Sequence, residues 1–120
     1  MPSPTQRVGN YGEFIACYYL RRNNYKILKR NYHSRFGEVD IIAKINSEII
    51  FIEVKTRKNN YYGYGVESVS KKKLKKIILA GQNYIIKNKL NFVSFRVEVI
   101  DIVLLKKSYR LRHYKDVELR

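Results

Sequence analysis

The sequence predicts an α/β fold in which one mixed β-sheet is flanked by helices, within a single domain that spans residues 1–120. Two segments carry apolar residues at helical spacing, and several shorter runs are rich in β-branched residues. Their order along the chain is helix, three strands, helix and strand, with room for a further edge strand. An apolar fraction of 45% in 120 residues is enough for one hydrophobic core.

The first helix is expected over residues 4–23. Ser3 and Gln6 have the spacing of a capping box, and Pro4 suits the first helical position. Asn23-Asn24 marks the expected end of the helix, and a short strand follows over residues 25–31. The apolar residues that recur at helical spacing are Val8, Tyr11, Ile15, Tyr18 and Tyr19.

Residues 37–45 and 48–57 are rich in β-branched residues. Asn46-Ser47 separates the two runs with acceptable turn chemistry, so we expect an antiparallel hairpin. Residues 59–65 are expected to form a loop because of their glycine and asparagine content.

A second helix can be capped by Ser68 or Ser70 and is expected to run to about residue 89. Its apolar stripe consists of Leu74, Ile77, Ile78, Tyr84 and Ile85. A long strand pattern follows over residues 92–105, and a basic edge strand is expected over residues 109–114.

Lysine and arginine number 25 against 10 acidic residues, which gives a formal net charge of +15. Such an excess favours a polyanionic partner, because basic side chains that neutralise phosphates gain from counterion release. Nucleic acid is therefore the expected partner. No membrane contact is expected, since the basic residues are spread along the whole chain. A merely solvated basic surface is the alternative that charge alone leaves open.

Lys71, Lys72 and Lys73 stand in the first turn of the second expected helix, where their charges oppose the helix dipole. This unfavourable placement suggests contact with phosphates, and Arg57 is a further candidate for nucleic-acid contact. The tyrosines of the loop between hairpin and helix either offer stacking surfaces for bases or pack on the sheet edge. They are Tyr61, Tyr62 and Tyr64.

Several classes of protein are disfavoured by what the sequence lacks. The single cysteine, Cys17, cannot form an internal disulfide, and His33 and His113 are too few for a zinc site. The start of the sequence lacks the basic and apolar regions of a signal peptide, and no apolar run approaches the length of a membrane span. A cytoplasmic location is expected.

The hairpin carries the residues that point to chemistry. A turn at residues 46–47 places Asp40 opposite Glu53 and Glu38 opposite Lys55, all on one face. Directly opposed carboxylates lie about 5 Å apart at Cβ and repel each other unless a cation lies between them. A hard divalent ion such as Mg²⁺ suits these oxygen ligands. The alternative is a set of cross-strand salt bridges, with Glu38 bound to Lys55 and Asp40 to a neighbouring base.

The opposite face of the hairpin is expected to be an apolar surface for the core. Acidic residues beside such a core usually have a partner or a metal ion. The residues of this surface are Val39, Ile41, Ala43 and Ile45 on the first strand and Ile50, Ile52 and Val54 on the second.

Asp40 with Glu53-Val54-Lys55 resembles the Asp and Glu-x-Lys signature of the PD-(D/E)xK nuclease superfamily. A set of four ordered motifs more closely resembles the YraN family of bacterial proteins, themselves similar to archaeal Holliday-junction resolvases. The resemblance covers most of the chain, and the ordered set is more specific than the bare signature. The motifs are Gly12-Glu13, Arg30-Asn31, Gly37-Glu38-Val39-Asp40 and Phe51-Ile52-Glu53-Val54-Lys55-Thr56-Arg57.

The resemblance implies a restriction-endonuclease-like fold and hydrolysis of phosphodiester bonds in DNA, with branched or junction DNA as one substrate class. It implies that Asp40, Glu53 and, from the first helix, Glu13 bind Mg²⁺ or Mn²⁺. Lys55 would position or deprotonate the attacking water. Arg96-Val97-Glu98 stands where the family has Arg-Phe-Asp, so Glu98 is left outside the predicted site.

Gly9 and Gly12 each disfavour the first helix by about 1 kcal/mol relative to alanine. They indicate either a close approach of Glu13 to the sheet or ordinary tight helix packing.

Two other functions stay open at this point. One is a nucleic-acid-binding protein that has the nuclease fold without catalysis, and the other is a basic RNA- or ribosome-associated module whose carboxylates are only ion pairs. Junction-cutting enzymes generally need two active sites, so the nuclease function is compatible with a homodimer.

Overall fold

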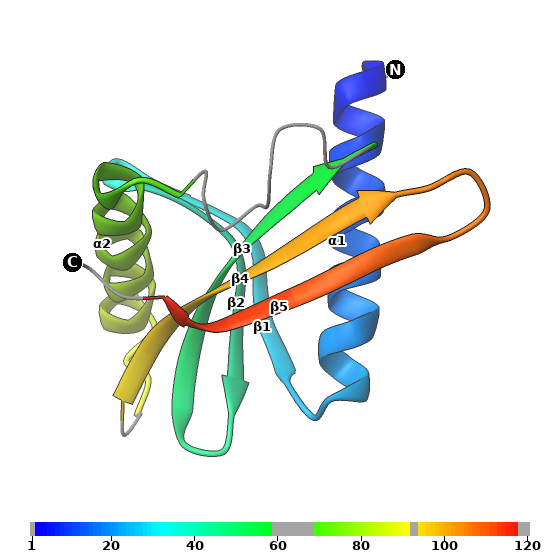
Figure 1. Ribbon diagram of the computed structural model, residues 1–120. Coiled ribbons are helices and arrows are strands. Elements are labelled where there is room, and N and C mark those ends of the chain that lie inside the picture. Colours follow the sequence, from blue (N-terminus) through cyan, green and yellow to red (C-terminus); the bar gives the residue numbers. More distant parts are fainter. Residues whose placement is uncertain (1, 59–68, 92–93, 118–120) are drawn as a thin grey trace.

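The computed structural model describes residues 2–58, 69–91 and 94–117, and it forms one five-stranded sheet with two helices (Figure 1). This confirms the predicted mixed sheet flanked by helices, and the expected edge strand is present. The helices are α1 (Pro4–Arg22) and α2 (Lys71–Lys87). The strands are β1 (Lys26–Ser34), β2 (Gly37–Ile45), β3 (Glu48–Arg57), β4 (Ser94–Leu104) and β5 (Tyr109–Val117).

The strands lie in the sheet in the order in which they occur along the chain. β3 and β4 are parallel, and α2 is part of the crossover that joins them. The other neighbouring strands are antiparallel. β1 continues three residues beyond its expected end because it pairs with β2 as far as Ser34 and Gly37.

The helix starts follow the predicted caps. The Ser3 side chain accepts a hydrogen bond from the Gln6 N–H, and the Gln6 side chain accepts one from the Ser3 N–H, which completes the capping box. Ser70 caps α2 by accepting a hydrogen bond from the Lys73 N–H at 3.1 Å. The other candidate cap, Ser68, and the loop tyrosines Tyr61, Tyr62 and Tyr64 lie outside the described residues.

Each face of the sheet has its own apolar cluster under one helix. α1 packs on one face and α2 on the other, so the sheet is the middle of three layers. Neither described helix combines the length and apolarity needed to cross a membrane. The α1 cluster includes Ile15, Leu20, Ile41, Ile50, Ile52 and Ile100, and the α2 cluster includes Ile42, Ile49, Phe51, Leu74, Ile77 and Val97.

Val39 does not lie on the face that the alternation of β2 predicts. It was expected beside Ile41, but it packs in the cluster under α2. The reversal coincides with Asn31 on β1, whose φ of 52° is left-handed. On the two sides of Asn31, Arg30 pairs with Ile41 and lies near α1, whereas Tyr32 pairs with Val39 and packs against α2. The strict alternation of a strand is therefore interrupted at this point.

Close packing against the sheet was expected at both Gly9 and Gly12 of the first helix, and it occurs at one of them. A Cβ at Gly12 would lie 1.8 Å from Thr56 Oγ1 on β3, whereas a Cβ at Gly9 would meet nothing within 4 Å. The close approach is thus confirmed for Gly12 and wrong for Gly9. Because Gly12 lies against β3, the following residue, Glu13, is held beside the sheet.

Candidate active site

The predicted hairpin register is confirmed where β2 and β3 are paired. Ile41 pairs with Ile52, and the pairing continues to Ile45 and Glu48. Next to the Ile41 pair, the Asp40 carboxylate accepts a hydrogen bond from the Val54 N–H, with a distance of 2.8 Å between Oδ2 and N. A side chain thus takes the place of a main-chain acceptor, and the Asp40 carboxyl is fixed against β3.

Asp40 and Glu53 form a hydrogen-bonded carboxyl pair. Burial, followed by the hydrogen bond and the charge of Glu53, raises the pKa of Asp40 to about 8. Burial also acts to raise the pKa of Glu53, but hydrogen bonds from Asp40 and Lys73 outweigh it, so that pKa lies below its ordinary value. At neutral pH the pair therefore shares one proton and carries one negative charge.

Lys73 is the residue that sequence reasoning placed elsewhere. It was expected at phosphates, but its Nζ lies 2.8 Å from Glu53 Oε2 and its charge belongs to the carboxylate pair. A signal was available, because Lys73 lies four residues before Ile77 and hence on the sheet-facing stripe of α2. Lys71 and Lys72 remain exposed to solvent.

Lys55 completes the cluster from β3. It lies two residues after Glu53 on the same strand, and its ammonium interacts electrostatically with both Glu53 and Asp40. Burial is the main cause that lowers the pKa of Lys55, and the nearby Lys73 lowers it further. The Lys55 amine therefore releases its proton more readily than a solvated lysine does.

Asp40, Glu53 and Lys73 border a cavity of about 570 Å³ between β2, β3 and the start of α2. Glu38 also lines it, but its expected pairing with Lys55 is wrong. Glu38 pairs with His33 across β1, and its carboxylate lies 3.1 Å from His33 Nδ1 in an exposed contact. Further lining residues are Asp40, Glu53, Lys72, Lys73 and Lys76.

Glu13 lies near the carboxyl pair but is not part of it. Its Oε1 is buried without a hydrogen bond and has only a long ion-pair contact, 3.7 Å, with Nη2 of Arg30. Burial raises the pKa of Glu13, and its charge also acts on Asp40. Among the residues that the structure describes, no three acidic, histidine or cysteine side chains form a ready-made metal cluster.

The donor set still fits a hard divalent cation. Two carboxyl groups lie side by side, and oxygen ligands suit such an ion. The Lys73 ammonium beside Glu53 shows that this position accommodates a positive charge. The unpartnered Oε1 of Glu13 is a third acceptor nearby. Asp40 and Glu53 are thus the residues that could hold the ion, with Glu13 as the adjacent acceptor.

Arg57 has a structural partner that sequence reasoning missed. Its Nη2 lies 3.1 Å from Oδ2 of Asp101 on β4, whose side chain is fully covered. Asp101 stands within an otherwise apolar run, and a charged residue in such a run predicts a partner. Asp101 therefore neutralises at least part of the Arg57 charge.

Glu98 lies in the opposite layer, among the groups on the α1 side of the sheet. Its carboxylate is 0% exposed and accepts hydrogen bonds from Tyr25 Oη at 2.9 Å and Arg96 Nε at 2.7 Å. His113 Nε2 lies 2.7 Å away. Burial acts to raise the pKa of Glu98, but His113, Arg96 and Tyr25 outweigh it and lower the pKa. Its omission from the candidate site agrees with this position.

Comparison with known proteins gives a consistent assignment. The model of the uncharacterised protein family UPF0102 matches residues 12–105. A UPF0102 protein of Clostridioides difficile is 51% identical over 105 residues, which cover 88% of this chain and 90% of that protein. A UPF0102 protein of Clostridium tetani is 45% identical over 118 residues, which cover 97% of each chain. One of Persephonella marina is 44% identical over 95 residues, which cover 79% and 82%.

Proposed function

Since the chain belongs to the protein family UPF0102, whose description assigns no activity, we propose from its site that it is a metal-dependent endonuclease that hydrolyses phosphodiester bonds in DNA. One observation carries the proposal: the carboxyl groups of Asp40 and Glu53 lie together with the amine of Lys73 at an open cavity, and the Lys55 amine interacts electrostatically with both carboxyl groups. The resemblance to the PD-(D/E)xK superfamily and the YraN family supports the same reaction.

In this function Asp40, Glu53 and the adjacent Glu13 would hold Mg²⁺ or Mn²⁺. The bound ion would supply Lewis-acid polarisation of the phosphodiester and a lowered pKa for water. Asp40 is positioned for this role by the Val54 N–H, which fixes its carboxylate without using a neighbouring side chain.

Lys55 is the residue proposed to move a proton. Because the pKa of its amine is lowered, Lys55 reaches the unprotonated form that accepts a proton from the attacking water at a lower cost than a solvated lysine does, and its protonated form can stabilise the charge that develops on the phosphate. Lys73 neutralises Glu53 and keeps a second positive charge beside Lys55, which favours the unprotonated form of the Lys55 amine.

DNA is the proposed substrate because the chain has a formal charge of +15 and because lysines border the cavity. Lys72 and Lys76 line the cavity, and the exposed Lys71 stands at the same end of α2. These lysines are the proposed phosphate contacts. Arg57 is a further proposed contact, although Asp101 neutralises part of its charge. A cytoplasmic location and a homodimer acting on branched DNA fit the same proposal.

The test is cleavage of linear, flapped and four-way-junction DNA in Mg²⁺ or Mn²⁺. We expect Asp40→Asn and Lys55→Ala each to lower the cleavage rate by about 100-fold or more while DNA binding persists. Lys75→Ala, an exposed lysine of α2, is the matched control and should cleave like the wild type. Equal rates in all four proteins would indicate a contaminating nuclease and refute the proposal.

A second candidate is a nucleic-acid-binding protein that has the same fold without catalysis. It is favoured by the lack of a ready-made three-residue metal cluster among the described residues. Calorimetric titration with Mn²⁺ separates the two candidates. A site that Asp40→Asn abolishes supports the enzyme, whereas DNA binding with no metal site supports the binding protein.

A further inference from the structure

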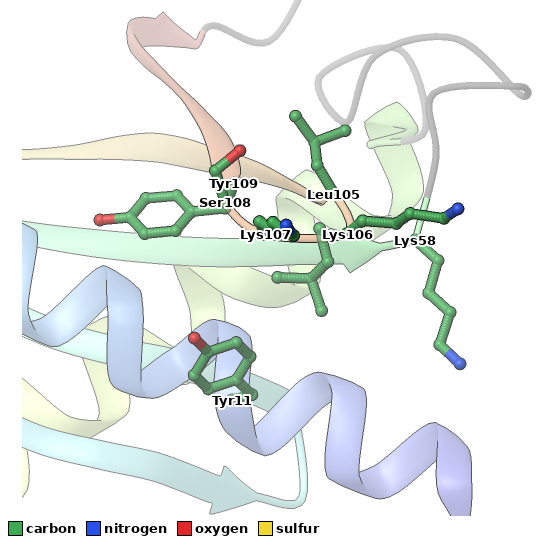
Figure 2. Close-up of a pocket in the computed structure, with 8 residues that line it drawn as sticks. Tyr11, Lys58, Leu105, Lys106, Lys107, Ser108 and Tyr109 are labelled. Atoms are coloured by element: carbon green, nitrogen blue, oxygen red, sulfur yellow. The ribbon is translucent and has the colours of Figure 1, made fainter.

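A second, larger cavity lies between α1 and the turn that joins β4 to β5, and it has no part in the proposed cleavage site (Figure 2). Its volume is about 890 Å³. Tyr11 enters it from α1, Lys58 from the residue after β3, and Lys106 and Lys107 from the β4–β5 turn. Three elements distant in sequence therefore supply its lining.

The lining combines positive charge with exposed aromatic rings. Lys58, Lys106 and Lys107 contribute amines, and no acidic side chain is among the described residues that line the cavity. Tyr11 and Tyr109 are 53% and 45% exposed, so their rings are accessible from solvent. Figure 2 shows the amines of Lys58 and Lys106 toward one end of the hollow and the two tyrosines toward the other.

This cavity is separate from the carboxylate cluster. Lys58 follows Glu53 by five residues along an extended strand, so the two positions are about 17 Å apart at a strand rise of about 3.3 Å per residue. The cavity lies between α1 and the β4–β5 turn, whereas the carboxylate cluster lies between β2, β3 and the start of α2, and the two linings share no residue.

We propose that this cavity binds a single-stranded segment of nucleic acid. Bases would stack on Tyr11 and Tyr109, while backbone phosphates would contact Lys58, Lys106 and Lys107. A single strand is the fitting ligand because its bases have free faces for the rings, whereas the bases of a duplex are already stacked. The proposal concerns binding alone and does not depend on cleavage at Asp40 and Glu53.

Tryptophan fluorescence gives a direct test, because the chain contains no tryptophan. Tyr11→Trp places a single reporter in the cavity. Tyr18→Trp is the matched control, since Tyr18 is also 53% exposed on α1 but is not among the residues that line the cavity. The probe is oligothymidylate of about 15 nucleotides in EDTA, a length near the upper site size of single-strand-binding folds.

We expect the oligonucleotide to quench the Tyr11→Trp signal in a saturable way, at least about threefold more than that of Tyr18→Trp, because a base stacks on the ring. Equal quenching of the two reporters, or none, would overturn the proposal.

The phosphate contacts are tested by fluorescence anisotropy of the same labelled oligonucleotide. Lys106→Ala with Lys107→Ala should weaken binding about tenfold and reduce the salt dependence by about one to two released counterions. The control is Lys26→Ala with Lys29→Ala, two exposed lysines on the distant strand β1. Equal weakening by both pairs would mean a general basic surface and would refute the cavity.

A duplex of the same length distinguishes this proposal from the proposed function. The Lys106 and Lys107 variant should keep duplex affinity to within about twofold, and cleavage of duplex DNA by the wild type is scored separately. If this variant loses more affinity for the duplex than for the single strand, the proposal of single-strand binding is overturned, even if the nuclease activity is found.

Discussion

The sheet carries buried carboxyl groups on both of its faces, and the two sites differ in how fully those groups are satisfied. On the α1 face, Glu98 has three hydrogen-bonding partners and its pKa is lowered. On the α2 face, Asp40 shares a proton with Glu53 and its pKa is raised to about 8. The pKa values of a fully buried carboxyl group and a partly buried one are thus shifted in opposite directions.

The difference indicates what each site is for. A carboxylate whose acceptor positions are filled by Tyr25, Arg96 and His113 has no need of a further ligand and holds the fold together. A pair that keeps a proton at neutral pH, beside an unpartnered oxygen of Glu13, gains when a cation replaces that proton. The incompletely satisfied face is therefore the one to which we assign function.

The largest expected effect is on stability at the satisfied site. Glu98→Ala removes the shared acceptor and leaves the buried Tyr25 and His113 without it, so we expect a loss of about 3–5 kcal/mol. Urea unfolding followed by circular dichroism measures it. Glu38→Ala, at an exposed carboxylate, should change stability by less than about 0.5 kcal/mol. A Glu98 loss below about 1 kcal/mol would contradict the comparison.

A smaller effect is expected where α1 contacts β3 beside the carboxyl pair. Gly12→Ala forces a Cβ into Thr56, so we expect a loss of about 1–3 kcal/mol. Gly9→Ala meets open space and should stabilise α1 by up to about 1 kcal/mol. Thermal unfolding of both variants checks the sign. A neutral Gly12→Ala would show that close packing does not hold Glu13 beside the sheet, and a destabilising Gly9→Ala would contradict the open space at position 9.

The third effect depends on pH. The pKa of Asp40 is raised from its ordinary value to about 8. Between about pH 4 and pH 8 the folded protein therefore keeps a proton on Asp40, whereas the unfolded chain has already released it. This contribution to stability is present below about pH 4 and is lost as the pH rises through 8. Asparagine does not ionise, so Asp40→Asn does not lose this stability at high pH. The melting temperature of the variant should therefore exceed that of the wild type by about 5 °C at pH 8.5.

Calorimetry of Asp40→Asn and wild type at pH 4.5 and pH 8.5, both in EDTA, gives the comparison. We expect the two melting temperatures to converge at the lower pH. Parallel pH curves for the two proteins would show that Asp40 is already ionised in the metal-free protein.

The smallest expected effect concerns Lys73. Lys73→Met frees the Glu53 carboxylate, so the affinity for Mn²⁺ should rise about threefold to tenfold. Lys72→Met is the control, because Lys72 lines the cavity without an ion pair to Glu53 among the described contacts. Titration calorimetry measures both affinities. An unchanged affinity in Lys73→Met would mean that the ammonium does not compete with the cation.

Much of the α2 face was predictable because it depends on local pattern. The turn at residues 46–47 sets the hairpin register, and the register brings Asp40 beside Glu53. The contact of Lys73 with Glu53 depends on how α2 lies on the sheet, which the helical stripe suggests but does not fix. The side of the sheet taken by Val39 depends on the left-handed Asn31, a backbone choice that composition did not reveal.

The α1 face was harder to predict, because its partners come from distant elements. Glu98 was recognisable only as one of two acids, with Asp101, in a largely apolar run, and Tyr25 and His113 lie 73 and 15 residues away in the sequence. No local pattern assigns such partners, since they are set by the tertiary packing of β4 against β5 and of α1 on the sheet. The predicted strands were right, but the network that holds them was not visible.

The bond from the Val54 N–H to Asp40 uses the main chain of β3 rather than its side chain. Every residue type except proline offers the same hydrogen at this position. The orientation of the Asp40 carboxylate therefore depends on the backbone at position 54, whereas the Val54 side chain serves separately in the packing against the α1 cluster.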